Sequence, residues 1–272
     1  MMKPAIFLDH IYDIARIDRL SLDNALSRLH LLGFDGLEVL FDPQVDPYAL
    51  ANRFYHGGMF VSCLCALVDF ANHPDDENLQ RTILEHCFAY NTHRCLIVPG
   101  KIDPEHPERT PELMANMVSA LNRFCEKARK QGITVVMEDF GSAAAPYHDA
   151  AGLRWFLDQV PLLQCGFDTG NFAFADEDAL DVFDPFKDRI THVHLKDFGP
   201  EPAAPEQKPF YSISGRALYG TPIGAGQVRN AEIIDRLKEI NYDGMLVVEH
   251  HAATQPLAWI EQTAKWLMPR IR

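Results

Sequence analysis

The sequence predicts an α/β fold: a single-domain (β/α)8 TIM barrel that spans residues 1–272. Eight short apolar runs alternate with longer amphipathic segments, a pattern typical of parallel strands joined by helical crossovers. The chain has 272 residues, and such a barrel typically needs about 250. No segment has the composition of a linker between two domains. A doubly wound open sheet is the alternative, but no glycine-rich phosphate loop follows the first predicted strand.

The predicted strands are short, apolar and rich in β-branched residues. In chain order they are AIFL (5–8), GLEVLF (36–41), FVSCLCAL (60–67), RCLIVP (94–99), ITVVME (133–138), LQCGFD (163–168), HVHLKD (192–197) and MLVVEH (245–250). Most connections between them are long enough for a helical crossover, so we expect the eight strands to pair in parallel.

Several intervening segments carry apolar residues at helical spacing. The strongest pattern lies in 110–132, where we expect Thr110 as the N-cap, Pro111 as the first helical residue and Gly132 as the stop. A second helix is expected to end at Gly33. Similar patterns predict further helices within 77–91, 230–244 and 255–268.

One segment interrupts this alternation. Residues 198–227 are rich in proline, glycine and aromatic residues and show no helical pattern. Loops longer than about 15 residues inside compact domains are usually functional or disordered. Because this segment leaves the C-terminal end of the seventh predicted strand, we expect a lid over the active site.

Composition excludes several classes of partner. The net charge is −13, from 38 acidic and 25 basic residues, which disfavours binding to nucleic acid or to an anionic membrane. Most of the six cysteines lie in apolar runs, so we expect buried free thiols. We find neither a signal peptide nor an apolar run of about 18 residues, and we therefore expect a cytoplasmic protein.

Four predicted strands end in, or carry, a side chain that can bind a metal. The segments are VVMEDF (135–140), CGFDTGNF (165–172), THVHLKDF (191–198) and MLVVEHH (245–251), and they supply Glu138, Asp168, His194 and Glu249. Parallel strands in a barrel deliver such residues to one end, where TIM-barrel enzymes act. Three carboxylates and one imidazole suit a single divalent ion, Mn²⁺, Mg²⁺, Co²⁺ or Zn²⁺. The sequence therefore predicts one metal site at this end.

Other polar residues near these strand ends are candidates for binding substrate. Asn171 lies three residues after Asp168 in the same motif, and Lys196 shares a strand face with His194. His192 shares that face too, and could orient substrate, bond to a carboxylate or fill the barrel interior. Two further candidates, Glu38 in the second strand and Arg216 in the long segment, could equally be structural and solvated, respectively.

In this order, the motifs GFDGLEVLF, VVMEDF, GFDTGNF, HVHLKD, PIGAGQV and GMLVVEH resemble the xylose-isomerase-like TIM barrel superfamily over nearly the whole chain. The group includes ketose 3-epimerases, hydroxypyruvate isomerase, inosose dehydratases and endonuclease IV. The resemblance implies metal binding by Glu138, Asp168, His194 and Glu249. It also implies that Glu138 and Glu249 are the catalytic pair, moving protons on either side of the substrate.

The resemblance implies a metal-dependent sugar isomerase or epimerase in carbohydrate metabolism, acting on a small polyhydroxy carbonyl compound through a metal-bound enediolate. An inosose-type dehydratase using the same site, a non-catalytic sugar-binding barrel and a homo-oligomer stay open. At Asn171 several relatives have a histidine that, in endonuclease IV, helps to hold a zinc cluster. This difference argues against DNA repair and bears on which sugar is recognised.

Overall fold

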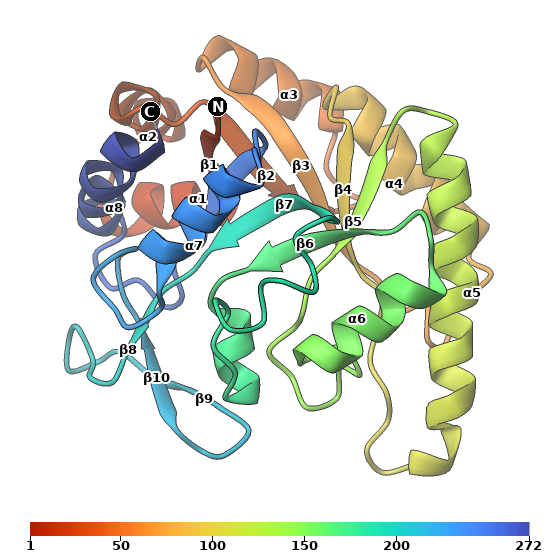
Figure 1. Ribbon diagram of the computed structural model, residues 1–272. Helices are drawn as coiled ribbons and strands as arrows, with labels where there is room; N and C mark the ends of the chain where they lie inside the picture. The colour runs from red at the N-terminus through yellow and green to blue at the C-terminus, as the bar shows by residue number, and fades with distance from the viewer. Residues whose placement is uncertain (272) are drawn as a thin grey trace.

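The computed structural model describes residues 1–271, in which eight parallel strands close into a barrel. Around the barrel the order is β1-β11-β7-β6-β5-β4-β3-β2, and β2 pairs with β1 to complete the circle (Figure 1). The strands are β1 (Lys3–Phe7), β2 (Gly36–Leu40), β3 (Phe60–Leu67), β4 (Arg94–Val98), β5 (Thr134–Met137), β6 (Gln164–Asp168), β7 (Ile190–Leu195) and β11 (Met245–Val248). Each coincides with a predicted strand to within a few residues, and the TIM-barrel prediction is confirmed.

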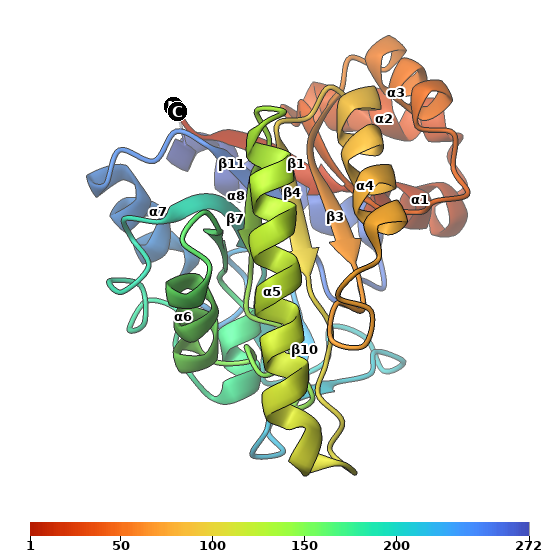
Figure 2. The same cartoon turned by 90° about the vertical axis from the view of Figure 1, so that its right-hand side faces the viewer.

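Helices surround the barrel, and the longest, α5, runs along its outside (Figure 2). They are α1 (Leu8–Ile17), α2 (Leu22–Leu32), α3 (Pro47–His56), α4 (Glu77–Ala89), α5 (Thr110–Arg129), α6 (Ala150–Gln159), α7 (Asn230–Glu239) and α8 (Pro256–Ile271). Buried apolar residues follow one side of each helix; in α5 they include Leu113, Met117, Leu121 and Phe124. This amphipathic side packs toward the strands and buries apolar area from water.

The ends of two helices test the predicted caps. Gly33 follows α2 with a φ of 97°, and its N–H bonds to the carbonyls of Leu29 and His30, as expected for a left-handed C-cap. The N-cap prediction for Thr110 is wrong. A 3-10 turn, η1 (Pro107–Arg109), leads directly into α5, so the chain is already helical at Arg109 and Thr110 is the first residue of the helix.

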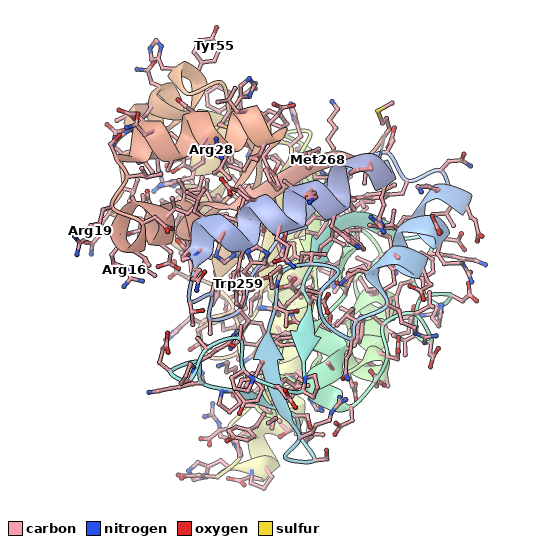
Figure 3. All side chains as sticks on the ribbon, turned by 90° about the vertical axis from the view of Figure 1, so that its left-hand side faces the viewer. Arg16, Arg19, Arg28, Tyr55, Trp259 and Met268 are labelled. Atoms are coloured by element: carbon pink, nitrogen blue, oxygen red, sulfur yellow. The ribbon has the colours of Figure 1, made fainter. Side chains whose placement is uncertain are left out.

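Helix α8 lies alongside α1 and α2 (Figure 3). Arg28 of α2 pairs with Glu261 of α8 across this contact. At the other end of α8, the sulfur of Met268 lies against Gly33, 3.4 Å from where a Cβ on that glycine would be. These contacts hold helix α8 against helix α2 and the glycine that ends it.

The six cysteines confirm the prediction of buried free thiols: all six are buried, and none is in a disulfide. Burial raises the pKa of Cys63, Cys65, Cys95 and Cys165 well above the usual value, so these thiols stay protonated. They act as small apolar side chains in and around the barrel. None of the helices in the described part of the chain is both long and apolar enough to cross a membrane.

Residues 198–227 are more ordered than their composition suggests. They contain a small antiparallel sheet made of β8 (Phe198–Gly199), β9 (Phe210–Tyr211) and β10 (Ala217–Gly220), in the order β8-β10-β9. Phe210 packs on Phe198, Phe174 and His251, so the sheet rests on the loops that follow β6 and β11. Figure 2 shows β10 beyond the end of the barrel toward which β3 and β4 point.

Candidate active site

The four predicted metal ligands converge at the C-terminal end of the barrel. Asp168 is the last residue of β6, Glu138 and Glu249 directly follow β5 and β11, and His194 lies in β7. Nδ1 of His194 is 2.8 Å from Oε2 of Glu138, 3.6 Å from Oε2 of Glu249 and 3.8 Å from Oδ2 of Asp168. Neighbouring parallel strands end at the same level, so side chains distant in sequence meet here.

Three atoms of this group fit a divalent ion. Oε2 of Glu138, Oδ2 of Asp168 and Nδ1 of His194 are buried and face one another, and the ammonium of Lys196 lies beside Oδ2 of Asp168. The three residues offer ligand atoms that all lie within 4.8 Å of one another. Buried carboxylates that face one another repel unless positive charge lies between them, and a divalent ion shared by two carboxylates and an imidazole would supply that charge. Glu249, the fourth predicted ligand, lies beside this group and has 27% of its side chain exposed.

Lys196 lies inside the same cluster. Its Nζ is 3.0 Å from Oδ2 of Asp168, 3.0 Å from Oε1 of Glu249 and 2.8 Å from Oδ1 of Asn171. An ammonium group has three protons, so these three acceptors use its full capacity. Burial alone lowers the pKa of Lys196, but the two carboxylates outweigh burial and raise it above the usual value. Lys196 is therefore a permanent internal cation that holds two of the proposed ligands.

The carboxylates differ in how easily they take up a proton. Burial raises the pKa of Glu138 to about 7, although the charge of His194 opposes this. Burial also raises the pKa of Asp168, but Lys196 and His194 outweigh it and bring the value down to about 2. Glu138 thus holds a proton far more readily than Asp168 in the metal-free protein.

Asn171 is buried, and both ends of its amide are engaged. Its Oδ1 accepts from Lys196, and its Nδ2 donates to the carbonyl of Asp139 at 2.9 Å. Asp168 Oδ1 accepts from the backbone N–H groups of Gly170 and Asn171, at the start of the 3-10 helix η2 (Asn171–Ala175). These bonds tie the loop after β6 to the metal-ligand group. The predicted substrate contact of Asn171 would use its one remaining amide proton.

Glu38 and His192 lie in the barrel interior with no exposed side-chain surface. Nε2 of His192 is 2.7 Å from Oε2 of Glu38, and Nε2 of His194 is 3.0 Å from the same oxygen. Burial lowers the pKa of His192 to about 4, against the raising effect of Glu38. Of the three roles open for His192, the structure shows the bond to a carboxylate. Neither Glu38 nor His192 has exposed side-chain surface with which to make the predicted contact to a substrate.

Arg216 lies apart from the proposed ligands. Its guanidinium is half exposed, with Nε 3.4 Å from Oδ1 of Asp176 and a bond to the carbonyl of Ala173. Both partners belong to the segment after β6. The structure thus brings Asn171 and Lys196 to the four predicted ligands, whereas Arg216, in the connection between β9 and β10, contacts Asp176 and Ala173.

Asp197 is a residue whose role the sequence did not reveal. Its carboxylate is buried and accepts from the backbone N–H groups of Phe198, Gly224, Gly226 and Val228, at 2.8–3.1 Å. A Cβ on Gly226 would lie 2.2 Å from Oδ1 of Asp197, so only glycine fits there. The sequence signal for this role was the combination of the glycines in PIGAGQ with an acidic residue at the end of β7. Asp197 anchors both ends of residues 198–227.

A cavity of about 500 Å³ opens at the same end of the barrel, beside the loops after β3, β4 and β5. Leu67, Val98 and Phe140 line it, with Lys101 and Arg109 at its polar side. The Nζ of Lys101 lies over the ring of Phe140, 5.4 Å from its centre. The space is mainly apolar with a few polar groups, as small-molecule sites generally are.

A family model described as "Xylose isomerase-like TIM barrel" matches residues 26–270. The chain belongs to this family. The curated inosose dehydratase of Lacticaseibacillus casei is 28% identical over 267 residues, which covers 91% of this chain and 89% of the relative. The resemblance seen in the motifs is therefore confirmed at the level of the family.

Solved structures of the family share the fold. The probable 3-DHS dehydratase AsbF from Bacillus anthracis aligns with a TM-score of 0.74 and 15% identity, covering 98% of both chains. D-allulose 3-epimerase from Methylomonas sp. aligns with a TM-score of 0.73 and 16% identity, covering 99% of this chain and 98% of that one. At such identities the similarity establishes the architecture alone.

Proposed function

We propose that the protein is a divalent-metal-dependent enzyme that removes a proton next to the carbonyl of a small polyhydroxy ketone. The convergence of Glu138, Asp168, His194 and Glu249 carries this proposal, because three carboxylates gathered around one imidazole nitrogen form a donor set that a divalent ion would stabilise. These four residues would hold the ion. A bound divalent ion would act as a Lewis acid and stabilise the negative charge that develops on the carbonyl oxygen.

Two carboxylates are placed to move protons. Glu138 and Glu249 follow strands β5 and β11, which are separated around the barrel by β6 and β7. Glu249 is the more exposed of the two, and its carboxylate takes the proton from the substrate carbon. Glu138, whose burial favours the protonated form, returns one. Lys196 keeps the Glu249 carboxylate in place through the contact at 3.0 Å.

We further propose that the reaction is a dehydration of an inosose-like cyclic ketone. The C–H bond next to the carbonyl breaks, its electron pair forms a carbon–carbon double bond, and the hydroxyl on the next carbon leaves as water with a proton from Glu138. The resulting enol then becomes a ketone. The similarity to an inosose dehydratase over 91% of the chain supports this outcome.

Isomerisation or epimerisation is the second candidate, and the paired carboxylates favour it. If Glu138 returns the proton to carbon instead of to a leaving hydroxyl, the same enediolate gives an epimer or an aldose–ketose pair. Both reactions share the first step. They differ only in whether water leaves, so one experiment separates them.

The test is to incubate the Mn²⁺-loaded protein with an inosose, D-allulose and D-fructose in D₂O and analyse the products by mass spectrometry. A product lighter by one water from the inosose alone supports the dehydratase. Deuterium incorporation into a ketose without loss of water supports the epimerase or isomerase. If neither exchange nor conversion occurs with any of them, the enzyme proposal fails and a binding barrel becomes the better interpretation.

Glu249→Gln is the matched variant, because it removes the base but keeps the side chain's shape. We expect turnover and deuterium exchange to fall by at least about 100-fold, the lower end of what one proton-transfer group contributes. Glu261→Gln, in the exposed pair with Arg28, is the control and should retain full activity. Full activity in Glu249→Gln would exclude the role given to this residue.

A further inference from the structure

Glu38 reaches across the barrel interior to the proposed metal ligand His194. It lies in β2, in register with Phe7 of β1 and Cys63 of β3, and its side chain has no exposed surface. One of its oxygens, Oε2, is 3.0 Å from Nε2 of His194 and 2.7 Å from Nε2 of His192. Two imidazoles 154 and 156 residues away in sequence thus converge on one carboxylate oxygen.

This contact determines where the protons of the two rings must lie. An ionised carboxylate only accepts hydrogen bonds, so each Nε2 has to carry a hydrogen. Two imidazole nitrogens at hydrogen-bond distance from one oxygen form the arrangement expected around an ionised carboxylate. A neutral ring with hydrogen on Nε2 has its lone pair on Nδ1. Nδ1 of His194 is the atom that faces Glu138, Asp168 and Glu249.

We propose that Glu38 is a positioning residue: by accepting the Nε2–H of His194, it fixes the orientation and tautomer of that ring and presents Nδ1 to the metal. The inference rests on the proposed function only in requiring a metal at this site. A lone pair among three carboxylates is repulsive unless positive charge lies between them, so Nδ1 is directed at a place that takes either a proton or a metal ion. Carboxylates that hold metal-binding histidines in this way raise their basicity and metal affinity.

His192 completes the arrangement. Its Nε2 is 3.2 Å from Nε2 of His194, and both rings donate to the same oxygen. His192 thereby restrains the Glu38 carboxylate from the other side. Oε1 of Glu38 and Nδ1 of His192 have no hydrogen-bond partner among residues 1–271, so the two residues have no visible alternative pairing.

A second metal ion held by Glu38, His192 and His194 is the competing explanation, since their ligand atoms also lie within 4.8 Å of one another. That ion would require His194 to bind metal through both nitrogens and lose both ring protons. The contacts of 2.7 and 3.0 Å are ordinary hydrogen-bond lengths. Unlike the proposed metal site, which includes Glu249 with 27% of its side chain exposed, this group has no side chain that is more than 1% exposed. We therefore expect one ion per chain.

The first measurement uses the wild-type protein without substrate. Side-chain ¹⁵N NMR of His194, assigned with the His194→Gln variant, should show Nε2 protonated and Nδ1 bound to a diamagnetic ion such as Zn²⁺ or Mg²⁺. Metal content by mass spectrometry should be one ion per chain. Binding through Nε2, or two ions per chain, would overturn the proposal.

The second measurement compares metal affinity in Glu38→Gln and in Cys63→Ala by calorimetric titration of the apo proteins. The amide keeps the size of Glu38 but has no negative charge, so it accepts the two Nε2–H groups less strongly than the carboxylate does. We expect affinity to fall about 10- to 100-fold, the usual effect of losing such a partner. Cys63 is a buried neighbour in the same layer of the barrel, and Cys63→Ala should lower stability without changing affinity.

These outcomes separate the inference from the proposed function. Unchanged affinity in Glu38→Gln, or an equal loss in Cys63→Ala, refutes the positioning role even if the enzyme turns over an inosose. Metal binding that depends on Glu38 supports the role even if no substrate is converted. Should Glu38→Gln fail to fold, the NMR result on the wild-type protein decides the question alone.

Discussion

Replacing Lys196 by Met removes the internal cation while keeping an unbranched side chain. Three acceptors lose their partner: Oδ2 of Asp168, Oε1 of Glu249 and Oδ1 of Asn171. Removing one member of a buried ion pair costs about 3–5 kcal/mol, because the remaining charge stays buried without compensation. Since Glu249 is partly exposed and can turn toward water, we expect the low end, about 3 kcal/mol, in the metal-free protein.

The cost should shrink when metal is bound. A divalent ion on Asp168 and Glu249 supplies the positive charge that Lys196 otherwise provides, and we expect a remaining loss of about 1 kcal/mol, close to that of an ordinary hydrogen bond to Asn171. By thermodynamic linkage, the difference of about 2 kcal/mol must appear as tighter metal binding by Lys196→Met, about 30-fold. Losing a positive charge thus strengthens metal binding while weakening the fold.

The assay is thermal unfolding of wild-type and variant protein in EDTA and in saturating Mn²⁺, with the dissociation constant measured separately by titration. At about 2–4 °C per kcal/mol for a chain of this size class, the variant should melt about 6–12 °C lower in EDTA. Lys238→Met is the control. Lys238 forms an exposed pair with Asp235 at 3.0 Å, and its loss should cost at most about 1 kcal/mol with or without metal. An equal loss for Lys196→Met in both conditions would refute the reasoning.

Three other predictions follow from individual contacts. Asp197→Ala removes the acceptor shared by four backbone N–H groups, so the free energy of unfolding should fall by about 3 kcal/mol. Limited proteolysis of this variant should cut first within 198–227, and first cleavage elsewhere would contradict the anchoring role. In metal-free protein, the pKa of Glu138 is raised to about 7, so the folded state binds more protons than the unfolded state between pH 4.5 and 7 and this residue's contribution to stability falls as pH rises. Glu138→Gln should therefore gain stability relative to wild type across that window, by about 3 kcal/mol at most, and urea unfolding curves at pH 4.5 and 7 that show a constant difference would exclude it. Arg189 donates to the carbonyls of Leu157, Val160 and Leu163, and Arg189→Met should lower the free energy of unfolding by about 2–4 kcal/mol without altering metal affinity, both measurable by urea unfolding and titration.

The strands could be predicted from sequence because each is a continuous apolar run, as expected when both faces of a parallel strand are covered. Helices α1, α3 and α6 were not anticipated. Helix α1 begins directly at the end of β1 without a side-chain cap. No turn residue therefore separates the strand pattern from the helix pattern in the sequence. The small sheet of β8, β9 and β10 was also missed, because two of its strands have only two residues each. A strand of two residues is too short to show the alternation of apolar and polar residues by which strands are recognised in a sequence.

Convergence of Glu138, Asp168, His194 and Glu249 could be predicted, since it follows from strand direction alone. The pairings around them could not. Glu38 and His194 meet only because β2 and β7 belong to one closed barrel, and sequence gives no measure of which side chains bridge its interior. Arg216 was equally open, because its partner Asp176 depends on how the loop after β6 turns.

The buried charges of this site explain why metal, protons and stability are coupled. Glu38, Glu138 and Asp168 are almost fully buried, and among residues 1–271 Lys196 and His194 supply the positive charge beside them. In the absence of metal, Glu38 and Glu138 outweigh burial and raise the pKa of His194 well above its usual value, so a proton on Nδ1 occupies the direction in which an ion would bind. An incoming ion has to displace that proton, and metal affinity must rise with pH while the proton is being lost. Lys196 cannot be displaced in this way because its pKa is raised, so it keeps two carboxylates in position whether or not metal is present. The proton on His194 is therefore exchanged for the metal ion, whereas Lys196 stays charged and keeps Asp168 and Glu249 in position.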